Sequence, residues 1–436
     1  MKYFFLFIIC IFLTSCSNKK LTSNYLDFKY QQDINILPAL DKNQTFSLNN
    51  YKKNFFSPWH MKITHKNPEQ IFWSFNFYMN TQKEFYFFNK QKIPKTWFEK
   101  QITNANAKDF LKINKKALVI KNSLLKNLPV DTPILLDPFK QGEGIPFDYA
   151  QDSVLNIASA ILVSHYTLDK RFVFVNTESG WGFIPAQNIE FFSDKRAKIY
   201  ENLNFITPLK DKFPIYDKDD NFIFQTRIGA LYPYYSEDKN FYFGKIGSLK
   251  FKFPKSKAVK FPLEFNENNL KSQLTQLLAL PYGWGGYNYE RDCSLFLRDV
   301  FAPFGLYMPR NSKAQSEYFT QFNISKLSNQ QKQIFLKKYA KTYLTLLYMK
   351  GHIMLYAGTI NDDILALHSA WGVKTKDDGR LLIAKNAITT LDIASDKKEV
   401  DSKDLFISRL SAVSFLSLSQ EEKEEISNYL QNINSH

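Results

Sequence analysis

The pattern that most limits the fold is a series of short apolar stretches, broken by turn residues, between residues 111 and 258. Within residues 111–192, the stretches RFVFVN and WGFIPA flank the turn-forming residues ESG. Residues 193–258 form a segment of roughly similar size with the same pattern of short apolar stretches and turn residues, although the two segments do not align residue by residue. Strands this short and this closely spaced predict two consecutive small β-barrels.

A different order of elements follows in residues 263–436. Leucines recur at helical spacing in NNLKSQLTQLLAL, and a second helix is expected from Cys293 onward. The later stretches GHIMLYAG and ILALHSAWG are typical of strands. Pro254, Pro262 and the charged residues between them predict a linker, and the aromatic-rich residues 31–110 have helix-like and irregular parts. The expected fold class is therefore α+β.

The N-terminus has the features of an export signal. Its apolar run is too short to cross a bilayer comfortably and is followed by small residues, which predicts a signal peptide over residues 1–15. The sequence LTSC resembles a bacterial lipobox, and this resemblance implies cleavage before Cys16 and a lipid on its sulfur. An ordinary signal peptide with an incidental cysteine is the alternative. The polar residues 16–30 are expected to form a tether.

Cys293 stands out because the chain has only 3 cysteines. Cys10 leaves with the predicted signal peptide and Cys16 receives the lipid, so Cys293 is the single remaining thiol of an exported protein. An unpaired thiol in an oxidising compartment suggests a nucleophile, and a buried inert cysteine is the alternative. Asp292 is a plausible N-cap, which places Cys293 in a first helical turn, where the helix dipole is expected to lower the thiol pKa from about 8.5.

A nucleophilic cysteine needs a base. His352 and His368 each lie near the end of an expected strand, 16 residues apart, which fits two adjacent antiparallel strands joined at GTINDD. A thiolate, a base and an orienting group are the components of nucleophilic acyl transfer. Structural histidines remain the alternative, and His60 and His65 are expected to be structural.

The segment PYGWGGYNYERDCSLFLRDVFAPFGLYMPRNS, followed by GHIMLYAG and LHSAWG, resembles the NlpC/p60 family of cell-wall cysteine peptidases. PFDYAQDS and the GW at 180–181 resemble the first bacterial SH3-like (SH3b) domain of a multi-domain branch. The resemblance implies a papain-like catalytic domain preceded by two SH3-like barrels and an N-terminal region. The family positions are Gly285, Gly286, Asp292, Cys293, Ser294, Pro309, Arg310, His352 and His368. The implied domains are 1–15 signal peptide, 16–30 tether, 31–110 stabilising region, 111–192 and 193–258 SH3-like domains, and 263–436 peptidase.

The resemblance implies cleavage of peptidoglycan stem peptides, commonly between γ-D-glutamate and a diamino acid. Cys293 is then the nucleophile, His352 the general base and His368 the residue that orients the base. Tyr282, with the backbone N–H of Cys293, is expected to stabilise the oxyanion; a packing role is the alternative.

Two further roles are candidates, the first from the resemblance and the second from guanidinium chemistry, and each has a plainer alternative. Asp292 and Ser294 are expected to hold the free amine of the substrate's L-alanine, although Asp292 also serves as a helix cap. Arg310 is a candidate carboxylate ligand, although the following SKAQ, a predicted capping box, equally starts a helix.

Two points depart from the family pattern. The resemblance implies that an acidic residue and a tyrosine of the first barrel contact the substrate. Glu143, Asp148 and Glu178 are the candidate acids here, and no tyrosine sits next to ESGW. Leu295 replaces the usual glycine of Asp-Cys-Ser-Gly, from which we expect altered fit of the cleft rather than loss of activity.

The formal charge of +15 comes from scattered lysines and arginines. This distribution favours attraction to an anionic envelope surface over nucleic-acid binding. No zinc-type spacing or phosphate-binding loop is evident, so no metal or organic cofactor is implied.

The sequence thus predicts a monomeric, lipid-anchored hydrolase of stem peptides or muropeptides at the periplasmic face of the outer membrane. A degenerate lipoprotein that only binds wall peptides, and an amidase or acyltransferase of the same fold group, are the alternatives.

Overall fold

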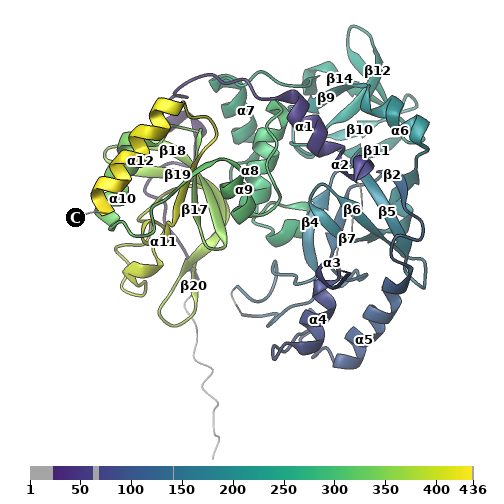
Figure 1. The fold of residues 1–436 in the computed structure, drawn as a ribbon, viewed down its shortest axis with the longest axis horizontal. Coiled ribbons are helices and arrows are strands. Elements are labelled where there is room, and N and C mark those ends of the chain that lie inside the picture. The colour runs from purple at the N-terminus through teal and green to yellow at the C-terminus, as the bar shows by residue number, and fades with distance from the viewer. Residues whose placement is uncertain (1–22, 62–67, 141, 435–436) are drawn as a thin grey trace, which may run out of the picture.

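The computed structural model describes residues 23–61, 68–140 and 142–434. The predicted signal peptide and Cys16 lie outside these residues, as do His65 and His436. The described chain contains three seven-stranded sheets. Two of them belong to small barrels and the third to the C-terminal domain, and Figure 1 shows the barrels on one side of the molecule and this domain on the other. The expected α+β class is therefore observed.

The first barrel has the sheet order β4-β3-β7-β6-β5-β2-β8, with antiparallel pairing between neighbouring strands. Its core comes mainly from β5 and β6, whose residues are almost all buried. The predicted turn at ESG joins β6 to β7, and Thr177 Oγ1 donates a hydrogen bond to the carbonyl of Gly180 across it (2.9 Å). The strands are β2 (Lys115–Val119), β3 (Ser123–Lys126), β4 (Gln151–Leu155), β5 (Ala160–Tyr166), β6 (Phe172–Thr177), β7 (Gly180–Pro185) and β8 (Ile189–Phe191).

The second barrel repeats this architecture in the order β11-β10-β14-β13-β12-β9-β15 and follows helix α6 (Asp194–Glu201). The linker predicted between Pro254 and Pro262 is wrong for most of its length. Residues 258–260 form a strand that pairs with β9, because an antiparallel partner is available there and closes the barrel. The strands are β9 (Asn204–Pro208), β10 (Pro214–Tyr216), β11 (Phe222–Gln225), β12 (Tyr232–Glu237), β13 (Phe241–Ile246), β14 (Leu249–Pro254) and β15 (Ala258–Lys260).

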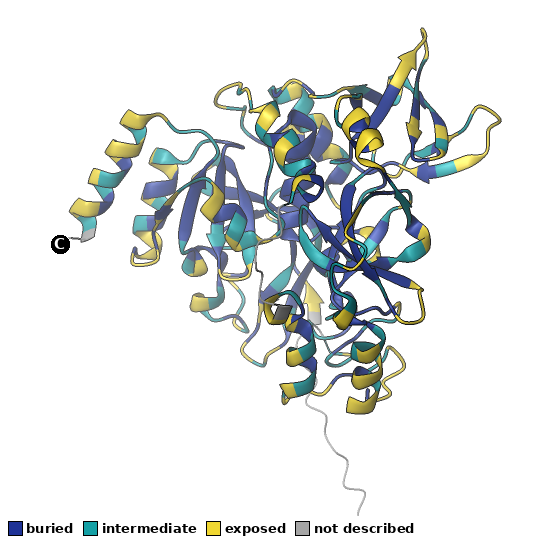
Figure 2. Ribbon diagram, turned by 45° about the vertical axis from the view of Figure 1, so that its right-hand side comes forward, coloured by how far each residue is buried: buried dark blue, intermediate teal, exposed yellow. Residues whose placement is uncertain are grey.

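The C-terminal domain packs helices around a sheet with the order β1-β20-β19-β18-β17-β21-β16. Helix α8 is buried along its whole length and contacts β18 and β19, as its broad apolar face predicted. Figure 2 shows the buried residues gathered on the strands inside the molecule and the exposed residues on outer helices and loops. The helices are α7 (Glu267–Leu277), α8 (Cys293–Phe301), α9 (Ser312–Tyr318), α10 (Asn329–Tyr339), α11 (Phe406–Arg409) and α12 (Gln420–Asn434). The strands are β16 (Thr320–Asn323), β17 (Thr345–Met349), β18 (His352–Ile360), β19 (Asp363–Lys374), β20 (Arg380–Thr390) and β21 (Ala412–Phe415).

Residues 23–41, here called the strap, wrap around the C-terminal domain. Strand β1 (Ser23–Tyr25) pairs in parallel with β20 and forms the edge of the sheet, and the short helix η1 (Ile34–Ile36) packs against α7. Leu26, Ile34 and Leu37 are buried in the core of this domain. The prediction of a tether through residue 30 is therefore wrong from residue 23 onward, because the apolar side chains scattered among the polar residues find a partner at the sheet edge.

The rest of the N-terminal region covers the barrels. Trp59, next to the end of this region's second helix, donates its indole N–H to the carbonyls of Ala117 and Ile161 in the first barrel (both 3.1 Å). The helices are α1 (Leu48–Phe55), α2 (Ser57–His60), α3 (Pro68–Ile71), α4 (Trp73–Asn80) and α5 (Lys95–Asn104). The remaining 3-10 helices are η2 (Ala107–Asp109), η3 (Ala186–Asn188), η4 (Lys255–Lys257), η5 (Trp284–Tyr289), η6 (Ala302–Phe304) and η7 (Ser402–Asp404).

A buried ionic cluster joins α8 to the second barrel. Arg291 donates two hydrogen bonds to Asp211 (2.9 and 3.0 Å) and a third to Asp299 (2.9 Å). Arg227 also pairs with Asp299 (3.3 Å), and all four side chains are at most 5% exposed.

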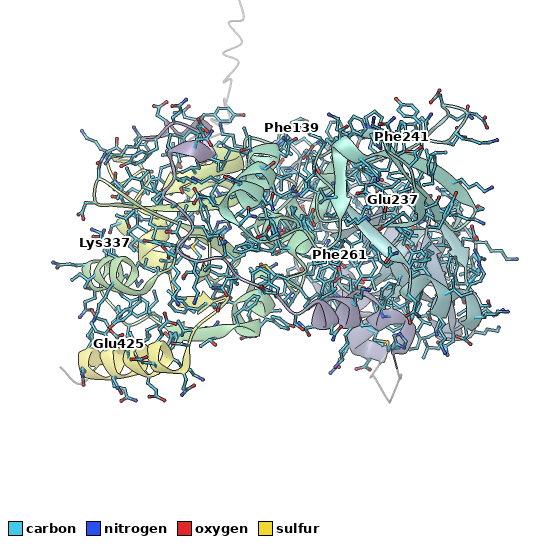
Figure 3. The ribbon with its side chains drawn as sticks, turned by 90° about the horizontal axis from the view of Figure 1, so that it is seen from above. Phe139, Glu237, Phe241, Phe261, Lys337 and Glu425 are labelled. Carbon is cyan, nitrogen blue, oxygen red and sulfur yellow. The ribbon has the colours of Figure 1, made fainter. Side chains whose placement is uncertain are left out.

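The first barrel holds the same helix through Glu178 and Ser179, which both bind Arg298. Both barrels therefore fix the position of α8. Figure 3 shows that Lys337 and Glu425, from α10 and α12, lie at the end of the molecule opposite Phe241 of the second barrel.

Candidate active site

Cys293 is the first residue of α8. Asp292 caps the helix as predicted, since its carboxylate accepts a hydrogen bond from the backbone N–H of Leu295 (2.9 Å). The backbone N–H groups of Ser294 and Ile353 lie close enough to the sulfur to favour its ionised form. Because Ile353 immediately follows His352, this contact brings the start of β18 against the thiol.

His352 and His368 form a hydrogen-bonded pair beside this cysteine. The predicted antiparallel pairing of β18 with β19 is observed, and His352 Nε2 lies 2.7 Å from His368 Nδ1. His368 Nε2 lies 2.9 Å from the hydroxyl of Thr389 on β20. Phe406 packs on both imidazoles, with ring centroids 5.9 and 5.1 Å away. The pair is therefore held in line and shielded on one side.

The thiol and the imidazoles are neutral near pH 7. Burial, together with the negative charge of Asp292, raises the pKa of Cys293 to about 12. Burial, with a smaller contribution from Arg409, lowers the pKa of His352 to about 3, and burial also lowers the pKa of His368. The expectation that the helix terminus lowers the thiol pKa is wrong here, because desolvation of the sulfur and the neighbouring carboxylate outweigh the helix dipole. A neutral thiol that attacks a carbonyl must lose its proton to a nearby base as it reacts.

Arg310 binds the Asp-Cys-Ser segment to the first barrel. Its guanidinium forms a two-pronged pair with Asp292 (2.7 and 3.1 Å) and also donates to Ser294 and Ser153 (both 2.8 Å). Four of its five N–H donors are thus used within the protein. This arrangement lowers the pKa of Asp292 although burial opposes the shift, and it leaves Arg310 little capacity for a substrate carboxylate.

A cavity of about 380 Å³ opens above the sulfur. It combines residues from the peptidase domain, the first barrel and α4, so three parts of the chain build one site. Its lining comprises Trp73, Phe77, Asn127, Tyr149, Gln151, Asp152, Tyr282, Trp284, Gly285, Asp292, Cys293, Ser294, Arg310, Asn311, Ser312 and Gly351. Five of the predicted site residues line this cavity: Tyr282, Asp292, Cys293, Ser294 and Arg310.

Known sequence families match the chain in four segments. The model of the NlpC/P60 family matches residues 279–377, which include Cys293 and both histidines. The N-terminal NLPC_P60 stabilising domain matches 5–110, and SH3 domains of SH3b1 and SH3b2 type match 133–185 and 193–239. The chain belongs to the NlpC/P60 family. This is a family of peptidoglycan-hydrolysing cysteine peptidases, so the protein is a cysteine peptidase of the hydrolase class.

The chain also resembles solved structures. An NlpC/P60 endopeptidase from Photobacterium damselae subsp. piscicida is 21% identical, with a TM-score of 0.80 over 91% of this chain and 99% of the other. An NlpC/P60 family protein from Bacillus cereus ATCC 10987 is 14% identical, with a TM-score of 0.48 over 69% of this chain and 100% of the other. At such identity, the first likeness establishes a shared fold. No curated protein matches the chain.

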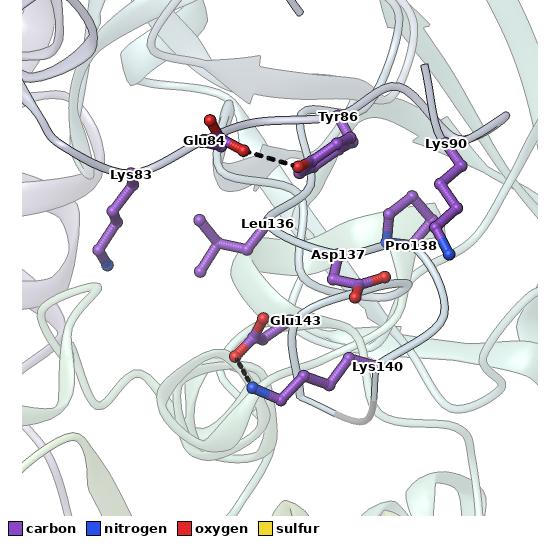
Figure 4. Close-up of a pocket in the computed structure, with 9 residues that line it drawn as sticks. All are labelled: Lys83, Glu84, Tyr86, Lys90, Leu136, Asp137, Pro138, Lys140 and Glu143. Atoms are coloured by element: carbon purple, nitrogen blue, oxygen red, sulfur yellow. Dashed lines mark hydrogen bonds and ion pairs between the residues drawn. The ribbon is translucent and has the colours of Figure 1, made fainter. Parts of the chain in front are cut away.

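The first-barrel acids of this NlpC/P60 protein were predicted wrongly. Asp148 is buried against Lys126 (3.1 Å), and Glu178 is paired with Arg298. Glu143 lines a different pocket, beside residues 83–90, where it pairs with Lys140 (2.7 Å; Figure 4). The acidic residue and the tyrosine of the first barrel that do line the cysteine cavity are Asp152 and Tyr149.

Asp152 and Tyr149 both occur in PFDYAQDS, the segment that carried the resemblance to the first barrel. The alternation of side chains between the two faces of β4 could have indicated Asp152. This residue is less buried than the neighbour on either side of it. The pKa of Asp152 is raised to about 7 by burial, against the opposing effect of its hydrogen bond from Asn127.

Two smaller predictions also change. Leu295 does not line the cavity: it is fully buried, in the interface where Gly286 approaches Val154, so it does not narrow the cleft. The N-cap of α9 is Asn311 rather than Ser312 of the predicted capping box, and Gln315 instead donates to the carbonyls of Ser294 and Pro309.

Tyr282 lies on the cavity wall, and burial, with the nearby thiol, raises its pKa.

The residues the structure describes contain no group of three or more His, Cys, Asp or Glu side chains suited to a metal ion. Among the same residues, no helix has the length and apolar character needed to cross a membrane.

Proposed function

We propose that the protein cleaves peptidoglycan stem peptides at the γ-D-glutamyl–diamino acid bond, with Cys293 as nucleophile, His352 as general base and His368 as the residue that orients the base. The main support is the aligned pair of histidines at the start of β18 and on β19, next to the sulfur at the tip of α8. Because Nε2 of His352 is bound to His368, Nδ1 is the nitrogen left for the thiol proton. The resulting tautomers also let His368 donate to Thr389.

In the proposed reaction, the sulfur attacks the γ-carbonyl carbon while the thiol proton passes to His352. The carbon–nitrogen bond then breaks, the proton moves to the departing amine, and a thioester remains on Cys293. Water attacks the thioester, gives its proton to His352, and the sulfur recovers a proton as it leaves. The N–H of Cys293, free at the first position of its helix, and the hydroxyl of Tyr282 are the proposed oxyanion donors.

The substrate's free amine is proposed to bind at Asp152 and Tyr149. Asp292, expected from the resemblance to serve here with Ser294, is neutralised by Arg310. Asp152 has no salt-bridge partner among the described residues, and an ammonium ion would favour its charged form. This favours short peptides with a free first residue over intact sacculi.

Membrane attachment remains part of the proposal. Lipid on Cys16 is proposed to hold a monomer at the periplasmic face of the outer membrane. Labelled palmitate incorporated into the wild type but not into a Cys16→Ala variant would support it, and equal labelling would refute it.

The test of activity uses free tripeptide, free tetrapeptide and intact sacculi, with products identified by mass spectrometry. We expect release of the diamino acid end from the free peptides, and no release by Cys293→Ala or His352→Ala. His60→Ala is the matched control, since this imidazole is exposed and pairs with Glu201 far from the cavity. Cleavage by Cys293→Ala, or products cut at another bond, would refute the proposed chemistry.

A further inference from the structure

A second cavity, of about 400 Å³, lies where the two barrels meet the peptidase domain. The first barrel contributes Lys121 and Asn122 to its lining, and the peptidase domain contributes residues 288–290. The second barrel contributes Lys212, strand β11 and the two residues after this strand. None of these residues lines the cavity that holds Cys293. We call this second space the junction cavity, and its volume is in the range of small-molecule sites.

A single loop separates the junction cavity from the active site. Gly285, in η5, lines the cysteine cavity, whereas Asn288 and Tyr289, at the end of η5, line the junction cavity. Tyr289 has a φ of 60°, which is unfavourable for a bulky side chain. Both barrels hold it there, because Arg227 donates to its carbonyl and its hydroxyl donates to the carbonyl of Asn122 (3.4 Å). The strained loop thus keeps the ring of Tyr289 on the wall of the junction cavity.

The cavity wall presents aromatic rings to solvent. Phe222, the first residue of β11, is 58% exposed, and Tyr289 on the peptidase side is 36% exposed. Ile223 and Phe224 extend the apolar wall between them and the barrel core. An aromatic ring left in solvent on a cavity wall offers a flat apolar face to a ligand.

Polar groups lie beside these rings. One carboxylate oxygen of Glu290 pairs with Lys212 (2.5 Å), and the other, which is buried, has no hydrogen-bond donor among the described residues. A buried acceptor without a donor is destabilising, and a ligand hydroxyl or amide N–H would supply one. The side-chain amides of Gln225 and Asn288 also line the cavity, and each can both donate and accept.

The charge of the lining favours a ligand with an acidic group. Glu290 compensates Lys212, and the guanidinium of Arg227 is paired with Asp299. The ammonium of Lys121 remains, since it has no ion pair among the described residues. Apolar ring faces, hydroxyl and amide substituents and one acidic group together describe an acidic amino sugar.

We propose that the junction cavity is a second, non-catalytic site that binds an acidic amino sugar. The sugar ring stacks on Phe222 and Tyr289, and a hydroxyl group donates to Glu290. The carboxylate or phosphate of the sugar pairs with Lys121. The bound sugar contacts the loop that ends just before the Asp-Cys-Ser segment, and the inference does not depend on the proposed reaction.

The test measures binding to the wild-type protein by isothermal calorimetry. The probes are N-acetylmuramic acid, which carries a carboxylate, N-acetylglucosamine 6-phosphate, which carries a phosphate, and neutral N-acetylglucosamine. At least one acidic sugar is expected to bind more tightly than the neutral one, and the tighter of the two identifies the acidic group. Phe222→Ala is expected to weaken its binding roughly twofold to tenfold, the range for one aromatic contact. Lys121→Gln should weaken only the acidic sugars, by up to about fivefold.

Tyr235→Ala is the matched control, because Tyr235 is an exposed aromatic of the second barrel (60%) outside the junction cavity. Binding of neither acidic sugar, or equal affinity for acidic and neutral sugars, would overturn the proposal. Equal affinities in Phe222→Ala and Tyr235→Ala would also overturn it. So would binding that is lost in Asp152→Ala instead, since Asp152 lines the cysteine cavity.

Discussion

The buried ionic cluster gives the most direct test of how the second barrel supports the catalytic helix. Asp211→Ala would remove two hydrogen bonds to Arg291 and the acceptor for the N–H of Ile228 (2.8 Å). The buried guanidinium groups of Arg227, Arg291 and Arg298 would then share one carboxylate, that of Asp299. Removing one partner of a buried pair costs about 3–5 kcal/mol, because the remaining charge stays desolvated. We expect a loss of this size in the free energy of unfolding.

Equilibrium urea unfolding measures this loss, with Asp219→Asn as the control. Asp219 is largely exposed beside Lys218, so its substitution is expected to change stability by less than about 0.5 kcal/mol. The double variant Asp211→Ala/Arg291→Met should be more stable than the sum of the single effects, since it removes both charges of the pair. A cost below about 1 kcal/mol for Asp211→Ala would refute the reasoning.

The cluster also has a defined pH dependence. Burial raises the pKa of Asp211, but the charge and hydrogen bonds of Arg291 lower it by a larger amount. The pKa of Asp211 is therefore lower in the folded state than in the unfolded state. The stabilisation is therefore complete above about pH 4 and is lost as the pH falls through the folded pKa. The same substitution should also lower the cleavage rate, because the carbonyl of Arg291 is held by Ser369 (2.7 Å) immediately before the Asp-Cys-Ser segment.

Three further outcomes are expected. With a pKa of about 7, Asp152 ionises as the pH rises from 6 to 8, so KM for free-amine peptides should fall over this range in the wild type and stay flat in Asp152→Asn; parallel profiles would contradict this. Arg310→Lys loses the two-pronged ion pair with Asp292 and should lower the free energy of unfolding by about 1–3 kcal/mol, as measured by urea unfolding. The same variant should have a lower kcat/KM in the peptide cleavage assay. Gly286→Ala would place a Cβ 2.4 Å from the Val154 side chain and should destabilise more than Gly351→Ala, which has a similar positive φ and open space; equal melting temperatures would contradict the packing difference.

The sequence predicted the parts of the site that depend on local order. Asp292 caps its helix through a contact three residues away, and the two histidine strands are joined by a short turn. Local patterns also predicted the two barrels, because their strands follow one another closely along the chain.

Predictions failed where distant segments meet. Asp211 and Arg291 are 80 residues apart, and nothing local marks them as partners. The thiol pKa was expected to fall because the helix position is visible in the sequence, whereas the burial of Cys293 that raises it depends on segments distant in the sequence, among them β18. Asp152 was missed because its exposure to the cavity depends on the way the first barrel faces the peptidase domain.

The strap has a consequence for how the peptidase domain is made. Tyr30 hydrogen-bonds to Asp363 (2.6 Å) and Asp41 accepts the N–H of Thr342 (2.7 Å), so residues synthesised early dock on strands synthesised some three hundred residues later. Both barrels are completed before that docking is possible. The catalytic domain is thus assembled from the two ends of the described chain. A fragment that begins at residue 263 would lack Ile34 and Leu37 and would expose to water the core residues against which they pack.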